Sequence, residues 1–209
     1  MNRFAGRVAL GAFVATAAAQ TPVQVRLDAG TFRYTDDQPL VEVYLSFGAE
    51  TLPFEPTADG FAAEVPVRVQ LLPSSSGAPA GVEPTAVYDQ TIPFQYLMAD
   101  TTSLQSGQVF VEQVRLAAVP GEYELDIEVS PAGRSQLRLA RDLRVPSYNS
   151  EFTMVSALQL ASGIQQATGG SDALTKSGLT IRPNPDACYG GNQGAVQYYA
   201  EVYGPPAQT

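Results

Sequence analysis

The chain has 209 residues, of which 44% are hydrophobic and 16% charged, and its formal net charge at pH 7 is −9. This length is enough for one large or two small domains with a substantial core. The acidic balance argues against nucleic acid and anionic membranes as partners. Because the chain contains no histidine, a Ser-His-Asp or Cys-His catalytic site is excluded.

Residues 1–19 are predicted to be a signal peptide. Arg3 and Arg7 form a positive start, residues 8–18 form an apolar run, and an Ala-Ala-Ala sequence at 17–19 provides a cleavage site. The run is far shorter than the roughly 20 apolar residues of a membrane span, and no cysteine follows it for lipid attachment. We therefore expect a protein exported to the periplasm or the extracellular space, with no membrane span and a net charge of −11 after cleavage.

The clearest pattern lies in residues 122–129, where apolar and acidic residues alternate. Tyr123, Leu125, Ile127 and Val129 fall on one face of an extended strand, and acidic residues occupy every other position. A period of two indicates one face in a core and one in water. This pattern is typical of antiparallel sheets, because parallel strands are buried on both faces.

Further strand patterns recur every ten to twenty residues, separated by turn residues. They cover residues 23–27, 31–34, 40–47, 61–71, 85–98, 109–116 and 137–145. Residues 74–84, rich in Ser, Gly, Ala and Pro, are predicted to be a loop, and Pro66 suggests a sheet edge or a bulge. Seven or eight strands without a convincing helix predict an all-β fold, with residues 20–148 as an antiparallel immunoglobulin-like β-sandwich.

Two details of this sandwich can be predicted from the pattern. The alternate apolar residues of 61–71 and those of 122–129 should both face its core. The outer face of 137–145 is basic where that of 122–129 is acidic. If the two strands pair through the turn at 131–133, opposite charges face each other across the hairpin.

Residues 151–209 are predicted to be a partial second β domain. Residues 152–167 fit either a helix or a strand, and the strand candidates are 153–160, 179–182 and 196–203. Three short strands are too few for a free-standing sandwich. We expect this region to dock on the first domain or to leave Leu160, Tyr198 and Val202 partly exposed. Its edges make it the expected interface for a missing C-terminal domain or for a second copy of the chain, with early proteolysis between 147 and 194.

Several short motifs resemble a known family. They are Ser156 to Ser162, Lys176 to Leu179, Ile181-Arg182-Pro183-Asn184-Pro185 and Tyr198 to Tyr203, together with Val41 to Leu45 and Pro120 to Tyr123. This set is similar to the region of bacterial GWxTD-domain proteins that precedes the domain giving the family its name. The chain has no tryptophan, so the Gly-Trp-x-Thr-Asp sequence is absent. The resemblance implies an exported, multi-domain β protein and assigns no activity to any residue.

The sequence offers no catalytic, cofactor or metal site. The segment 169–173 resembles a nucleophile elbow but lacks a base, and Lys176, the only lysine, has no Ser-x-x-Lys spacing. One cysteine without histidine disfavours zinc. Asp36-Asp37 could hold calcium in a turn, although no EF-hand-like loop surrounds it. Cys188 cannot form an intrachain disulfide and is interpreted as a half-buried, inert thiol, with a reactive or intermolecular role as the alternative.

Two functional classes remain open. The first is a non-catalytic module with structural or protein-interaction roles in the bacterial cell envelope. The second is a carbohydrate-binding module, which would need a platform of exposed aromatic rings. Tyr198, Tyr199 and Tyr203 form the only local tyrosine cluster. Three coplanar, exposed rings at these positions would favour the carbohydrate-binding module.

Overall fold

The computed structural model describes residues 22–35, 38–74, 84–149, 152–168, 173–189 and 195–204. Its regular elements there are β-strands, apart from the short 3₁₀ helix η1 (Ala49–Thr51). Within these ranges no helix is both long enough and apolar enough to cross a membrane. The predicted signal peptide and the candidate calcium ligands Asp36 and Asp37 lie outside them. The fold is all-β with antiparallel sheets, as the alternating pattern predicts.

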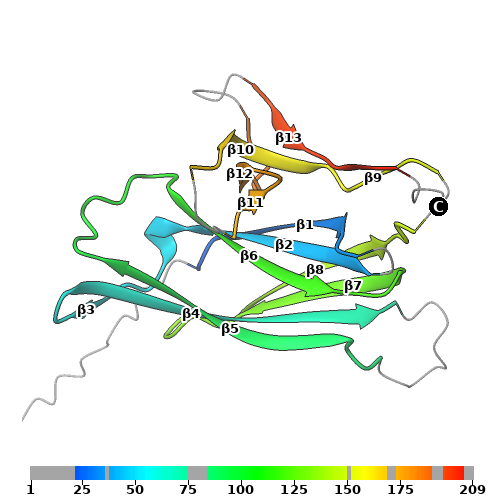
Figure 1. The fold of residues 1–209 in the computed structure, drawn as a ribbon. Helices are drawn as coiled ribbons and strands as arrows, with labels where there is room; N and C mark the ends of the chain where they lie inside the picture. The colour runs from blue at the N-terminus through cyan, green and yellow to red at the C-terminus, as the bar shows by residue number, and fades with distance from the viewer. Residues whose placement is uncertain are drawn as a thin grey trace, which may run out of the picture.

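The described strands form three layers (Figure 1). The middle layer is a sheet in the order β1-β2-β6, and every pairing in it is antiparallel. Its strands are β1 (Val25–Arg33), β2 (Pro39–Gly48) and β6 (Val109–Ala117). The two short strand candidates at 23–27 and 31–34 are one continuous strand, because β1 pairs with β2 without interruption.

The lower layer is built around the long strand β4. Its strands are β3 (Glu55–Thr57), β4 (Gly60–Pro73), β5 (Tyr88–Met98), β7 (Gly121–Val129) and β8 (Leu137–Val145). Residues 67–71 of β4 pair with both β5 and β7, so these two strands lie on opposite edges of β4. β8 continues the sheet beyond β7, and β3 pairs with the first residues of β4.

The core lies between the middle and lower layers, so these two sheets form a β-sandwich. The predicted inner rows adjoin in the lower sheet and are buried: Ala63, Val65, Val67, Val69 and Leu71 of β4 beside Tyr123, Leu125, Ile127 and Val129 of β7. The inner row of β2 is equally buried, with Val41, Val43, Leu45 and Phe47 fully enclosed. Phe61, at the start of the β4 row, is only partly buried.

The predicted charge pairing between β7 and β8 is present. Glu122 faces Arg144 across the hairpin, and Glu128 faces Arg138. Arg138 donates to both oxygens of Asp126 at 2.8 Å. The alternating pattern predicts that Asp126, like the other acidic residues of this face, lies in water. That prediction is wrong for Asp126, which is only 6% exposed because the Arg138 guanidinium covers it.

Pro66 lies on an inner strand and not at a sheet edge. It faces Pro93 of β5, and its carbonyl accepts a hydrogen bond from Ser130 N at 3.0 Å on the β7 side. The nitrogen and carbonyl of one strand residue point to the same side, so the missing N–H of Pro66 costs no hydrogen bond to β5. By the same geometry the ring nitrogen of Pro93 faces the free edge of the lower sheet, where proline discourages pairing with another chain.

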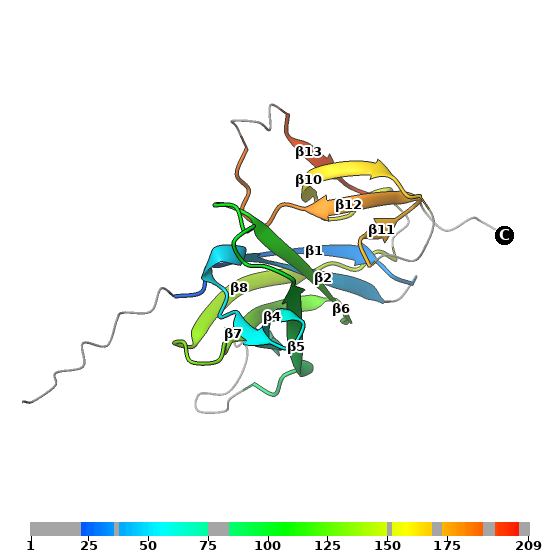
Figure 2. The same ribbon diagram turned by 90° about the vertical axis from the view of Figure 1, so that its left-hand side faces the viewer.

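Residues 152–168, 173–189 and 195–204 form a third layer above the middle sheet, visible in both views (Figures 1 and 2). Four strands follow the order β11-β12-β10-β13, and β9 pairs with β14. These strands are β9 (Met154–Val155), β10 (Gln159–Gln166), β11 (Thr175–Lys176), β12 (Leu179–Pro183), β13 (Gln197–Tyr199) and β14 (Val202–Tyr203). The division of the chain into domains 20–148 and 151–209 stays a prediction.

The region from Phe152 to Ala167 is extended and not helical. It contains β9 and β10, and the register of β10 against β12 shifts between Ala161 and Gly163. This irregularity moves side chains from one face to the other. The mixed periodicity of the sequence follows from it.

Candidate functional site: a buried ion pair, a pocket and an apolar face

The upper face of the middle sheet is polar, yet it is buried. Glu42, Tyr44 and Ser46 alternate along β2 with the core residues and point away from the sandwich core, but each is at most 2% exposed. In an isolated sandwich such a face lies in water. Here the third layer covers it, so its charged and polar groups need partners inside the protein.

A tight hairpin brings Lys176 to this face. Lys176 at the end of β11 pairs with Leu179 at the start of β12, which leaves a two-residue turn of Ser177 and Gly178. Both turn residues have positive φ, 48° and 77°. Two such residues are characteristic of the type I′ hairpin turn, whose twist matches that of the strands.

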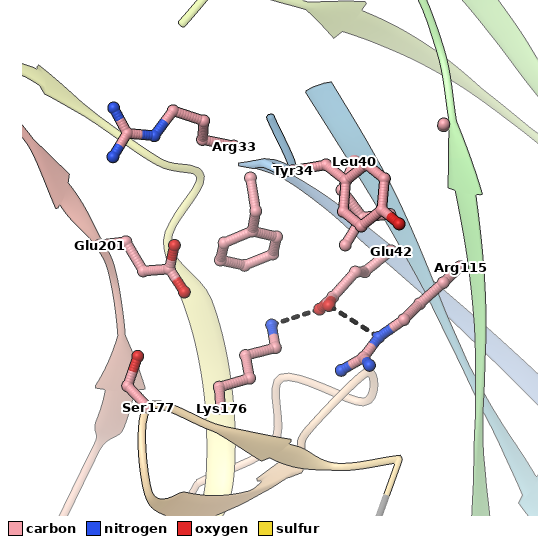
Figure 3. Close-up of a pocket in the computed structure, with 10 residues that line it drawn as sticks. Arg33, Tyr34, Leu40, Glu42, Arg115, Lys176, Ser177 and Glu201 are labelled. Atoms are coloured by element: carbon pink, nitrogen blue, oxygen red, sulfur yellow. Dashed lines mark hydrogen bonds and ion pairs between the residues drawn. The ribbon is translucent and has the colours of Figure 1, made fainter. Parts of the chain in front are cut away.

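The ammonium of Lys176 is paired with the carboxylate of Glu42 at the centre of the interface (Figure 3). Lys176 Nζ also donates to Tyr44 Oη at 3.1 Å and to Gln159 Oε1 at 2.8 Å. Glu42 accepts from the Tyr44 hydroxyl and, at 3.0 Å, from Arg115 Nε. Since the Lys176 and Glu42 side chains are only 7% and 2% exposed, this network is shielded from water.

Aromatic rings enclose the same ammonium. Lys176 Nζ lies 3.6 Å from the ring centroid of Phe32 and 5.4 Å from that of Tyr199, within reach of a cation–π attraction. Burial lowers the pKa of Lys176, and the adjacent Glu42 carboxylate opposes that shift. Burial and the charge of Glu42 both raise the pKa of Tyr44, so its hydroxyl stays protonated and donates to the carboxylate.

Further hydrogen bonds join the third layer to the sandwich. Ala157 N donates to the carbonyl of Thr31 on β1 at 2.9 Å, and Ser46 Oγ donates to Asp186 Oδ1 at 2.8 Å. A small apolar cluster completes the contact. It contains Phe32 of β1 and Ala161, Ile181 and Tyr199 of the third layer. The third layer therefore packs on the sandwich through its own core residues.

A cavity of about 520 Å³ opens beside the ion pair, between the middle and third layers. Its lining includes Phe32, Arg33, Glu42, Arg115, Ser177 and Glu201. Figure 3 shows Arg33 and Arg115 on opposite sides of the Lys176–Glu42 pair. The cavity thus combines charged groups of both signs with an aromatic wall.

The opposite surface of the third layer is apolar and exposed. Leu160 of β10 pairs with Tyr198 of β13, and Val155 of β9 pairs with Val202 of β14. Val155, Tyr198 and Val202 are 58%, 60% and 70% exposed. Leu158 and Val196 are also exposed large hydrophobic residues of this layer. We call Val155, Leu158, Leu160, Val196, Tyr198 and Val202 the outer apolar face.

The predicted tyrosine platform does not form. Tyr198 is exposed, but Tyr199 and Tyr203 are buried at 9% and 6% exposure. Their hydroxyls donate to the two oxygens of Glu201, at 2.7 Å from Tyr199 and 2.6 Å from Tyr203. Tyr199 and Tyr203 therefore belong to the interior of the third layer, and of the three rings only that of Tyr198 lies on the surface.

The remaining sequence candidates are not assembled into a site. The prediction of a half-buried thiol is wrong, because Cys188 lies in a surface loop and is exposed. Residues 169–172 of the elbow-like segment lie outside the described ranges. Within the part of the chain that the structure describes, no group of three or more Cys, Asp or Glu side chains could hold a metal ion. The Lys176–Glu42 pair was not predicted. Its signals were the single lysine before a Ser-Gly turn and an acidic residue inside an apolar run.

No protein-family model and no curated protein matches this chain, so the similarity to the GWxTD family stays a hypothesis drawn from the short motifs alone.

Proposed function

We propose that this protein is an exported, non-catalytic β-sandwich module with a protein-interaction role in the bacterial cell envelope. Its third layer presents the interaction surface, and a second copy of the chain is the partner. The observation that carries this proposal is the outer apolar face, where two cross-strand pairs leave aliphatic and aromatic side chains in water. Contiguous apolar surfaces of this kind mark interaction sites.

β13, the strand at the edge of the outer apolar face, is suited to pairing with a strand of another chain. No strand pairs with the outer edge of β13 in the described part of the chain, and residues 195–204 contain no proline or basic residue. The free edge of β5, in contrast, carries Pro93. Edge strands without such protection recruit further strands. A second copy supplies an identical β13, whose residues Gln197–Tyr199 carry no charge in an otherwise acidic chain.

The strand order supports an immunoglobulin-like type for the sandwich. The sheet β1-β2-β6 faces a sheet in which β8, β7, β4 and β5 follow one another. The pairs β1–β2, β4–β5 and β7–β8 are hairpins, and the other connections cross between the sheets, as in Greek-key sandwiches. The Tyr123 hydroxyl near the start of β7 donates to the carbonyl of Val119 at 2.9 Å. A tyrosine bonded back to the preceding corner is a hallmark of such sandwiches.

The chemistry of Lys176 supports a non-catalytic role. Its ammonium contacts Glu42, Tyr44 and Gln159, which engages all three of its N–H groups. A lysine so paired offers no free lone pair to act as a base or nucleophile. The carbohydrate-binding alternative loses its main support, because only one ring of the tyrosine cluster is exposed.

Sedimentation velocity across protein concentrations tests the proposal. We expect the wild-type chain to dimerise below about 1 mM, the range in which association of about −4 kcal/mol becomes visible. The double variant Tyr198→Ser, Val202→Ser should remain monomeric, because it removes apolar area from the outer apolar face without touching a core.

Leu97→Ser is the matched control. Leu97 is 80% exposed on β5, the strand that carries Pro93, and its replacement should leave dimerisation unchanged. A wild-type chain that is monomeric throughout, or equal dimerisation of the double variant, would contradict the proposed partner.

A further inference from the structure

The cavity beside Lys176 is distinct from the outer apolar face, and its two carboxylates already accept hydrogen bonds within the protein. Glu42 accepts from Tyr44, Lys176 and Arg115. Glu201 accepts from Tyr199 on one oxygen and from Tyr203 on the other. These hydrogen bonds hold both carboxylates in place and use at least half of the acceptor positions of each one.

Donors, in contrast, remain free at the cavity. The Arg33 side chain makes no hydrogen bond or ion pair with the residues that the structure describes, and its guanidinium stacks 4.6 Å from the ring centroid of Tyr203. Arg115 uses Nε for Glu42 and Nη2 for the carbonyl of Ala173, which leaves Nη1. The Ser177 hydroxyl contacts Tyr199 Oη at 3.3 Å, and because the proton of Tyr199 goes to Glu201, Ser177 is the donor in this contact, which leaves the two arginines as the free donors.

Arg33 is an exposed residue, and contacts with Tyr203 restrain it. Its backbone N–H donates to Tyr203 Oη at 2.9 Å, while its guanidinium lies over the same ring. Stacking of this kind restricts a side chain that otherwise loses considerable rotamer entropy on binding. A guanidinium held in place is well suited to bind a carboxylate with two parallel hydrogen bonds.

We propose that this cavity binds a small organic anion that carries a carboxylate on an apolar body. The carboxylate accepts two parallel hydrogen bonds from the Arg33 guanidinium, and the apolar body packs against the wall that includes Leu40 and Ala117. The cavity volume of about 520 Å³ lies in the range of small-molecule sites. The charges of Arg33, Arg115 and Lys176 exceed those of Glu42 and Glu201, in a chain whose net charge is −9.

An NMR titration with benzoate as the probe tests this inference. At constant ionic strength we expect saturable shifts of the Arg33 and Ser177 amides. Benzamide, a neutral molecule of the same shape, should bind roughly tenfold more weakly, and so should benzoate to the Arg33→Gln variant, because a charge-assisted hydrogen bond is lost in each case.

Arg26→Gln is the control, since Arg26 is an exposed arginine of the same strand that does not line this cavity. It should bind benzoate as the wild type does. Three results would overturn the inference: no saturable shift, equal affinity for benzoate and benzamide, or unchanged affinity in Arg33→Gln. Shifts confined to Tyr198 and Val202 would likewise place the probe on the outer apolar face and overturn it. Dimerisation through that face is a separate result that this titration does not affect.

Discussion

Replacing Ile127 with Asp should leave the protein unfolded or severely destabilised. Ile127 is fully buried in β7, between the two sheets of the sandwich. A carboxylate at this position has no partner, and burying an unpaired polar or charged group costs several kcal/mol. Domains are stable by only about 5–15 kcal/mol in total, so most of that stability would be lost. Thermal and urea unfolding, followed by circular dichroism, measure the effect.

The neighbouring residue provides the control. Glu128 lies on the opposite face of the same strand, is only partly buried and faces Arg68 of β4 and Arg138 of β8 across the sheet. Glu128→Ala should change stability by less than about 1 kcal/mol, as for other partly exposed ion pairs. Equal melting temperatures of the two variants would show that the register of β7 is wrong.

Lys176→Met should destabilise the third layer by about 3–5 kcal/mol, the usual cost of removing one partner of a buried ion pair. The variant keeps most of the apolar stem but leaves the Glu42 carboxylate buried with one cationic partner, Arg115. The sandwich core is untouched. Two-dimensional NMR should therefore show the native amide signal of Ile181 in the third layer disappearing at lower denaturant concentration than that of Ile127 in the sandwich core.

The double variant Lys176→Met, Glu42→Gln tests the origin of this effect. Removing both charges avoids the unpaired carboxylate, so stability should recover toward that of the wild type or exceed it. A double-mutant cycle gives the coupling between the two side chains. Additive effects, with no recovery, would show that the two charges do not interact across the interface.

The sandwich could be predicted from the sequence because each of its strands has one face in a core. The alternation in residues 122–129 and 137–145 gave the face, the partner and the charge pairing of β7 and β8. Asp126 and Pro66 were misjudged for local reasons. A single guanidinium covers Asp126, and the side to which a proline nitrogen points in a ladder is not visible in composition.

The covered face could not be predicted in the same way. Glu42, Tyr44 and Ser46 have the composition of a solvated strand face, yet they are buried. The burial of Glu42 and Tyr44 depends on Lys176, which lies in a hairpin more than 130 residues away in the sequence and contacts both side chains. Alternation reports which side of one strand is polar. It carries no information about a distant polar group that satisfies that side. A count of strands predicts that the region either docks on the first domain or leaves Leu160, Tyr198 and Val202 partly exposed. Both occur, because the third layer bonds to β1 through Ala157 and these three side chains are exposed or partly exposed on its other side.

Docking of the third layer through a buried polar interface is the central claim, and hydrogen exchange at the amide of Ala157 tests it most directly. This N–H donates to the carbonyl of Thr31 on β1 across the interface, whereas that of Ile181 donates to Leu174 within the third layer. We expect the Ala157 amide of the wild type to exchange more than about a hundredfold more slowly than in an unfolded chain, and to lose this protection in Lys176→Met. Unprotected exchange at Ala157 in the wild type, with Ile181 still protected, would show a third layer that is folded but not docked and would contradict the account.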